Sequence, residues 1–276
     1  MADWPLYDGQ GAETVGVTSA SSIGVAVTSA GTINTKGSWT EIIAATSSDA
    51  TGMIVNIGRG HTQTADFLVD IGIGGSGSET VLIPNLKADN GTSLLGPGQI
   101  IIPIGVPAGS RLSARCQATA ASAVSRIQVL LQRGSWLGQP PLSRVTDYGT
   151  VTGDSGATSI DPTTTANTKG LWAQIAASTA NPMRAMLVAI GNVANSNRSA
   201  GDWLVDIGIG GSGSEVVIIA DWHIEASTSD DVIYPRYLGP IGVNIPAGTR
   251  LAARAQSTTM ADSADRLFDL AIYGID

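Results

Sequence analysis

Two glycine-rich segments are the first places in the chain where residue types and spacing suggest chemistry. Gly72–Gly77 and Gly208–Gly213 both fit G-x-G-x-x-G, the pattern that brings amides at a helix N-terminus to a pyrophosphate. That chemistry requires a helix after the glycines, whereas Glu79–Pro84 is a largely β-branched run that ends in proline. We therefore interpret both segments as hairpin connections between strands and expect no nucleotide cofactor.

A second short motif resembles the surroundings of a nucleophilic serine. Gly153-Asp154-Ser155-Gly156 has the residue types found around that of chymotrypsin-like proteases, but the oxyanion-side glycine is replaced by Ala157. A triad also needs a base, and His61 lies in a polar segment that we interpret as a loop. We interpret the motif as turn residues, and we expect no catalytic residues and no enzyme activity.

Metal-ligating residue types are sparse. The two histidines, His61 and His223, do not occupy equivalent places, and neither has a neighbouring His or Cys at ligand spacing. Cys116 is the one cysteine, so no intramolecular disulfide forms. The oxygen-rich pairs Asp89-Asn90 and Asp230-Asp231 suit calcium by ligand type only, and we prefer to interpret them as solvated turns. We expect no metal site.

The element that must position all these residues is a duplicated domain. Residues 68–79 recur letter for letter at 204–215, and the blocks 34–39 and 107–115 recur in the same order at 167–172 and 246–254. This period far exceeds that of solenoid repeats, so each copy can own a core. We predict one domain over residues 1–137, a second over 147–276 and a proline-containing linker over 138–146.

Strand patterns dominate both copies. Phe67–Ile73 alternates large apolar residues with others, and short β-branched runs separated by Gly, Ser, Asn and Pro recur along the chain. This pattern predicts an all-β protein of two tandem, similar antiparallel β-sandwich domains. We expect a jelly-roll-like sandwich, with an immunoglobulin-like one as the alternative. Ala120–Arg126 and Met260–Arg266 are expected to be loops with a helical turn.

Residues at matching places in the two copies are expected to share one environment. We predict that the pairs Trp39 and Trp172, Phe67 and Trp203, and Cys116 and Ala255 are mostly buried. Opposite the apolar face, acidic and basic residues recur at period two in both copies. We predict at least one Asp–Arg pair, within a copy or between subunits, among Asp66, Asp70, Arg111, Arg115, Asp202, Asp206, Arg250 and Arg254.

Aromatic residues outside the repeated blocks are candidates for partner contacts. Trp4 and Trp222 have no clear counterpart in the other copy, and Tyr234, Arg236 and Tyr237 form a Tyr/Arg cluster of the kind that interfaces favour. We therefore predict a partner-binding set that combines them with the four repeated arginines: Trp4, Trp222, Tyr234, Arg236, Tyr237, Arg111, Arg115, Arg250 and Arg254.

Charge and hydropathy limit the classes of partner that we expect this protein to bind. The formal net charge of -8, without any basic run, argues against a nucleic-acid footprint. No stretch approaches the roughly 20 apolar residues of a membrane helix, so we expect no membrane contact. The first residues lack the basic start and apolar run of a signal peptide. We expect synthesis in a host cytoplasm.

The blocks 69–79, 81–86 and 107–115 resemble a pattern found in structural proteins of tailed-bacteriophage virions, and the second copy departs from it at Ala220-Asp221-Trp222. The resemblance implies a non-enzymatic virion protein, such as a capsid decoration or cement protein or a tail or fibre-base component. Its partners would be other virion proteins and itself, as a homo-oligomer. The alternative is a carbohydrate- or receptor-binding module of a phage tail.

Overall fold

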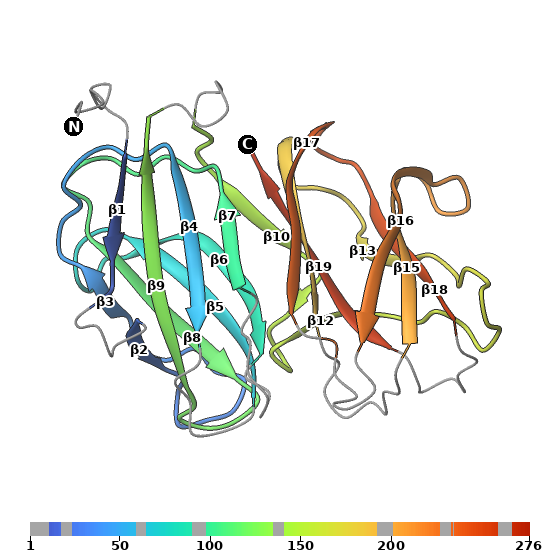
Figure 1. The fold of residues 1–276 in the computed structure, drawn as a ribbon, viewed down its shortest axis with the longest axis horizontal. Coiled ribbons are helices and arrows are strands. Elements are labelled where there is room, and N and C mark those ends of the chain that lie inside the picture. The colour runs from blue at the N-terminus through green and yellow to red at the C-terminus, as the bar shows by residue number, and fades with distance from the viewer. Residues whose placement is uncertain are drawn as a thin grey trace, which may run out of the picture.

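The computed structural model describes residues 11–17, 24–58, 65–89, 98–134, 141–191, 201–226, 233, 235–258 and 267–276. These residues form antiparallel sheets and no helix, as expected for an all-β protein. Strands up to Arg133 build two facing sheets, which we call sandwich one. Strands from Val145 onward build two more, which we call sandwich two (Figure 1).

Each sandwich has a sheet A and a sheet B. In sandwich one, sheet A has the order β1-β9-β4-β7, with β2 also paired to β9, and sheet B has the order β3-β8-β5-β6. The strands are β1 (Gly11–Val15), β2 (Val25–Thr28), β3 (Thr40–Ile43), β4 (Gly52–Gly58), β5 (Asp66–Ile73), β6 (Thr80–Asp89), β7 (Gly98–Ile102), β8 (Leu112–Ala118) and β9 (Val124–Arg133).

Sandwich two repeats this order. Its sheet A runs β11-β12-β19-β14-β17, with β10 also paired to β19, and its sheet B runs β13-β18-β15-β16. The strands are β10 (Val145–Tyr148), β11 (Thr150–Val151), β12 (Gly156–Ile160), β13 (Ala173–Ala176), β14 (Met183–Gly191), β15 (Gly201–Ile209), β16 (Val216–Ala226), β17 (Arg236–Ile245), β18 (Leu251–Ser257) and β19 (Phe268–Ile275).

The strand order is that of a jelly roll. When β1 and β2 are taken as one interrupted strand, two four-stranded antiparallel sheets face each other, and the first strand lies beside the last. An immunoglobulin-like sandwich would order its strands differently. The jelly-roll expectation is therefore confirmed, and the duplication extends from the sequence to the topology.

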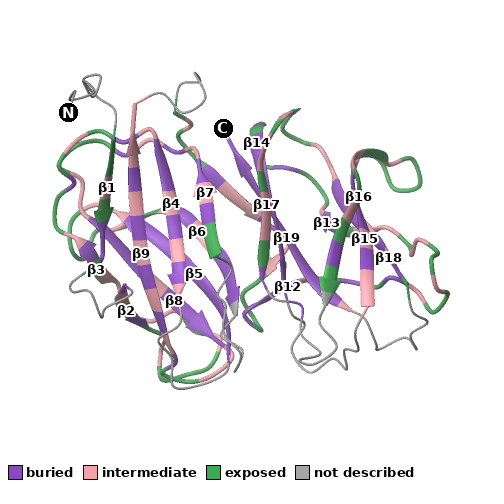
Figure 2. Cartoon of the chain, viewed as in Figure 1, coloured by how far each residue is buried: buried purple, intermediate pink, exposed green. Residues whose placement is uncertain are grey.

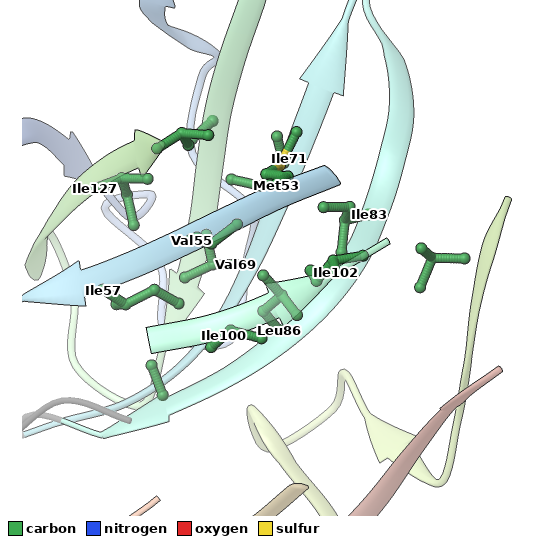
Figure 3. Close-up of a cluster of buried hydrophobic side chains, with 14 of the residues drawn as sticks. Met53, Val55, Ile57, Val69, Ile71, Ile83, Leu86, Ile100, Ile102 and Ile127 are labelled. Atoms are coloured by element: carbon green, nitrogen blue, oxygen red, sulfur yellow. The ribbon is translucent and has the colours of Figure 1, made fainter. Parts of the chain in front are cut away.

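The core of sandwich one lies between its sheets. β-branched and other aliphatic side chains of β4, β5, β6, β7 and β9 interdigitate there, as Figure 3 shows for Val55, Val69, Ile83 and their neighbours. Phe67 and Cys116 are fully buried in this core, and Trp203 and Ala255 are equally buried in the second. The burial predicted for these four residues is confirmed. Their side chains point into the core because successive residues on a strand point to opposite faces of the sheet.

One expectation about local structure changes. Val124–Arg126 belongs to β9, because Arg126 pairs with Ala26 on one side and Gly58 on the other, so the expected helical turn covers at most the preceding residues. Met260–Arg266 lies outside the described residues. Within the predicted linker, Leu142 bridges to Ile104, and β10 begins at Val145.

The two sandwiches pack closely against each other. The outer face of sheet A of sandwich two contributes Ala185, Leu187, Ala189, Ala271, Tyr273 and Ile275 to the same buried cluster as the core of sandwich one. Strand β14 contacts β6, and β17 contacts β7. Figure 2 shows β14, β17 and β19 between sandwich one and the far sheet of sandwich two. We call this contact the junction.

Candidate functional site

The repeated sequence blocks meet in one charge cluster on the outer face of each sheet B. Asp70 on β5 lies directly opposite Arg115 on β8, and the carboxylate Oδ2 is 2.9 Å from the guanidinium Nε. Asp206 and Arg254 repeat this register, also at 2.9 Å. The prediction of an Asp–Arg pair is therefore confirmed in both copies, within each copy.

A lysine completes each cluster. Lys36 Nζ lies 2.8 Å from Asp70 Oδ1 and donates to the Leu68 carbonyl at 3.0 Å. Lys169 does the same with Asp206 at 2.7 Å and with the Leu204 carbonyl. The lysine reaches this position because the residue two before it, Asn34 or Asn167, turns the chain with a φ of 53° or 57°. Asparagine tolerates this left-handed conformation better than most residues.

The tryptophan of the repeated block covers this cluster and is not part of the core. Trp39 and Trp172 are each more buried than exposed, as predicted, but neither belongs to a core cluster, so the interpretation of this pair as core residues is wrong. A Cβ placed on Gly72 or Gly208 would lie within 3 Å of the respective ring, so each indole packs closely against an outward-facing glycine of β5 or β15. Arg115 lies 4.4 Å above Trp39, and Arg254 lies 4.5 Å above Trp172, as cation–π contacts.

Burial and polar contacts shift the pKa values of the charged groups in these clusters in opposite directions. Burial raises the pKa of Asp206, but the Asp221 amide, Lys169 and Arg254 outweigh that effect and hold the pKa below its ordinary range. Burial lowers the pKa of Lys36, with Asp70 opposing the shift. The clusters are closed sets of ion pairs within each sandwich, so Arg115 and Arg254 already have partners.

The glycine-rich segments form the predicted hairpins. Strands β5 and β6 pair antiparallel on either side of the turn, and β6 starts at Thr80 where a nucleotide site would need a helix. The Gly77 amide donates to Glu79 at 2.9 Å, and Arg111 binds both Glu79 and the Gly74 carbonyl. In this turn the Gly77 amide, which a phosphate would need, is already used by the chain's own carboxylate.

Arg250, Glu215 and Gly213 repeat that arrangement in sandwich two. Arg111 and Arg250 are therefore paired with glutamates, and not with the aspartates of the predicted charge pattern.

The serine of the protease-like motif belongs to the junction. Ser155 is fully buried, donates to Asn34 Oδ1 at 2.9 Å and accepts from the Gln117 amide at 3.0 Å. Asp154 accepts from the Gly156 amide at 2.8 Å, as in a turn. His61 lies outside the described residues. Ser155 thus holds two segments of sandwich one to sandwich two, consistent with the turn interpretation.

A buried ion pair lies at the centre of the junction. Lys87 of β6 is fully buried, and its Nζ lies 2.8 Å from Asp269 Oδ2 of β19. A Cβ on Gly191 would lie 2.5 Å from Lys87 Cε, so that glycine provides the space through which the lysine passes. Burial raises the pKa of Asp269, and the charge of Lys87 opposes the shift. The Ala157 amide also donates to this carboxylate at 2.9 Å.

Two tyrosines of sandwich two hydrogen-bond to the β6 backbone. Tyr273 donates to the Asn85 carbonyl at 2.6 Å and accepts from the Lys87 amide at 3.0 Å, while Tyr237 donates to the Lys87 carbonyl at 2.8 Å. Burial raises the pKa of the Tyr237 hydroxyl well above its ordinary value. The Asn85 side chain also donates to Asp147 at 2.9 Å. Tyr237, predicted to bind a partner, therefore contacts the chain's own first sandwich.

The remaining residues of the predicted partner set lie in different environments. Trp222 is half-buried and packs on the core of sandwich two, and Arg236 is exposed and donates to the Glu225 carbonyl at 3.1 Å. Trp4 and Tyr234 lie outside the described residues. The predicted set thus does not form one patch, and partner binding by these residues stays a prediction.

Sequence reasoning missed the residues of the junction. Lys87, Gln117 and Asp269 lie on three strands far apart in the chain, and Lys87 is replaced by His223 in the second copy, so no repeat marks it. The lysines of the charge clusters could have been identified from the sequence, because both belong to a repeated block.

The junction also borders a pocket of about 580 Å³, whose polar lining includes Asn34, Lys36, Asn85, Arg115 and Gln117. Over the described part of the chain, no group of three or more His, Cys, Asp or Glu is placed to hold a metal ion. A search of the same residues for a helix long and apolar enough to span a membrane finds none.

Comparison with known proteins gives one structural likeness to report. No family model matches the chain, and no curated protein sequence matches it. The chain is similar to the solved structure of PNGF-II in the C2 space group, with a TM-score of 0.39 and 9% identity. The match covers 96% of this chain and 64% of that one, so the chain spans less than two thirds of its length. A likeness at this score carries no argument about activity.

Proposed function

We propose that this chain is a non-enzymatic structural component of a tailed-bacteriophage virion, acting through protein–protein contacts as a capsid decoration or cement protein or in the tail or fibre base. The observation that carries the proposal is that the charged and polar motifs pair with one another inside the chain and form no catalytic group among the described residues. The repeated Asp, Arg, Lys and Trp residues close on one another within each sandwich. Lys87 and Asp269 join the sandwiches.

A chain built this way suits the role of a rigid block. The buried ion pair and the tyrosine hydrogen bonds fix the two sandwiches relative to each other, which a flexible pair of binding modules does not need. Two similar domains held in one orientation offer two similar sets of surfaces to a symmetric particle. The resemblance of the repeated blocks to virion proteins supports the same reading.

The test is to locate the protein in particles. Virions of the phage that encodes the chain would be purified through a density gradient, analysed by mass spectrometry and imaged with an antibody against the chain. We expect the chain in stoichiometric, regularly placed copies on the head, tail or fibre base. Recovery of the chain only in the soluble fraction of the lysate would overturn the proposal.

A carbohydrate-binding role is the second candidate, and the pocket beside the junction favours it. Amide, carboxylate and guanidinium groups line this pocket, and these groups hydrogen-bond sugar hydroxyls. The test is a glycan array followed by titration calorimetry with Thr35→Trp, which would block the pocket rim. Glycan binding that survives this variant unchanged would remove the pocket from consideration.

A further inference from the structure

The junction is formed by two different surfaces, one on each sandwich. Because the domain is duplicated, each sandwich also has a counterpart of the other's surface. On sandwich one the contributing surface is centred on Leu68, Asn85, Lys87 and Gln117 of sheet B, which we call the edge surface. On sandwich two it is the outer side of sheet A, around Leu187, Asp269 and Tyr273, which we call the face surface. Sandwich two must therefore carry a second edge surface, and sandwich one a second face surface.

The second edge surface is open to solvent among the described residues. Leu204 pairs with His223 and Gln256 in the register in which Leu68 pairs with Lys87 and Gln117. The Lys87 side chain is 0% exposed, whereas that of His223 is 58% exposed. On the same strand, Val216 and Val217 are 63% and 40% exposed.

The second face surface is also uncovered by any described segment. Ile54 pairs with Leu130 as Leu187 pairs with Tyr273, and Ile101 lies on the other side of Ile54. These three aliphatic residues are half-buried, whereas Leu187 and Tyr273 are fully buried. Figure 2 shows this side of β4 and β9 facing the viewer, with intermediate and buried positions alternating along both strands.

The space and the charge needed for docking are both present on this second face. Gly58 pairs with Arg126 in the register in which Gly191 pairs with Asp269, so the glycine that admits Lys87 in the junction has a counterpart. At the place of the acidic Asp269 stands a basic residue, Arg126, whose guanidinium donates to the Gly24 carbonyl at 3.2 Å and forms no ion pair within the described chain.

The second edge surface keeps two carboxylates and loses a positive charge. Asp202 pairs with Glu225 as Asp66 pairs with Asp89 in the first copy, and His223 stands where Lys87 does. The junction's Asn85–Asp147 hydrogen bond has its counterpart positions in Asp221 and Thr14, an acceptor and a donor. The basic Arg126 of the second face and the carboxylates of the second edge therefore have opposite charges, so these two surfaces are complementary.

We infer that the chain self-associates head to tail, with the edge surface of sandwich two docking on the face surface of sandwich one of the next molecule. This contact repeats the geometry of the intrachain junction, with Arg126 in the place of Asp269 and His223 in the place of Lys87, and Arg126 meets the carboxylates of Asp202 and Glu225. Because the two surfaces differ, the interface is heterologous and builds a ring or an open filament. The inference deepens the proposed function and rests on it, since it assigns the self-contact of a structural protein.

The test is the mass of the purified full chain in solution, measured by sedimentation velocity over a range of concentrations and salt. We expect oligomers that dissociate on dilution and at high salt. Arg126→Glu and Glu225→Arg should each weaken association by about tenfold or more, and the double variant should restore it. Arg184→Glu, which reverses an exposed arginine elsewhere, is the matched control and should leave the mass unchanged.

Thermal melting of each variant shows whether the fold is retained. A chain that is monomeric at every concentration, or an oligomer insensitive to both reversals, overturns the inference. If the chain is monomeric in solution yet present in virions, this contact is wrong while the proposed function stands. If it assembles with the expected charge dependence but is absent from virions, the contact stands and the proposed function fails.

Discussion

At the residue scale, ionisable side chains in this protein serve structure in two different ways. Asp70 and Asp206 sit in clusters repeated in both sandwiches, where an arginine, a lysine and a backbone amide share one carboxylate. Lys87 and Asp269 occur once, fully inside the junction. Their environments predict different responses to substitution and to pH.

Replacing Lys87 by alanine is expected to destabilise the protein by about 3–5 kcal/mol, because the variant leaves the Asp269 carboxylate buried without its partner. His223→Ala is the matched control: it alters the equivalent position of sandwich two, which is exposed, and should change stability by about 0.5 kcal/mol or less. Urea unfolding of both variants measures the difference. Equal effects of the two substitutions would contradict the structural role of the pair.

The Asp206 cluster predicts acid sensitivity. Its folded pKa lies below the ordinary value, so the unfolded chain takes up a proton at higher pH than the folded chain. The stabilisation is complete above the ordinary aspartate pKa of about 3.9 and is lost as the pH falls through the folded pKa. The stability gap between the natural chain and Asp206→Asn should therefore be largest near neutrality and should narrow on acidification. A gap that does not depend on pH in urea unfolding would rule this out.

At the element scale, each jelly roll has a turn segment that packs beside sheet A through its glycine and against the outer face of sheet B through its lysine and tryptophan. Gly37 approaches the Thr28 carbonyl so closely that a Cβ would lie 2.1 Å from it, and Gly170 repeats this against Asp161. The segment ends in the tryptophan that lies against a strand glycine. The glycines of these repeated blocks thus allow backbone and tryptophan rings to pack where a side chain would clash.

Gly72→Ala should displace the Trp39 ring, because the added Cβ would lie 2.7 Å from its nearest carbon. We expect a loss of stability of about 1–3 kcal/mol from this overpacking and an altered tryptophan emission. Gly208→Ala should act alike on Trp172. Gly153→Ala, where a Cβ meets nothing within 4 Å, is the control. Unchanged emission in both strand variants would show that the rings do not depend on these glycines.

At the scale of the whole molecule, the junction is expected to make the two similar domains unfold as one cooperative unit. The outer face of sheet A of sandwich two shares a buried cluster with sandwich one, so neither half unfolds without exposing apolar surface of the other. We expect a single calorimetric transition for the natural chain. Tyr273→Phe combined with Lys87→Ala should separate it into two. Two transitions in the natural chain would show that the junction couples the sandwiches only weakly.

Much of this architecture was open to prediction from the chain alone. Alternating apolar residues determined the strands, because side chains on a strand point to opposite faces, and the letter-for-letter repeat determined that two similar folds follow. The period-two charges repeated in both copies predicted at least one Asp–Arg pair, and the structure showed that β5 and β8 are neighbours that pair Asp70 with Arg115. The glycine hairpins followed from the strand patterns on both sides.

The tertiary structure alone decided which surfaces and contacts particular residues occupy. Trp39 is the same residue type as a core tryptophan, and only the outward direction of Gly72 places it on the surface of the sheet. Lys87 and Asp269 are ordinary charged residues in the sequence, and they meet only because sheet A of sandwich two packs against β6. Periodicity is a local property of the chain and fixes faces and strands. Contacts between distant strands depend on how whole sheets pack, which no local pattern records.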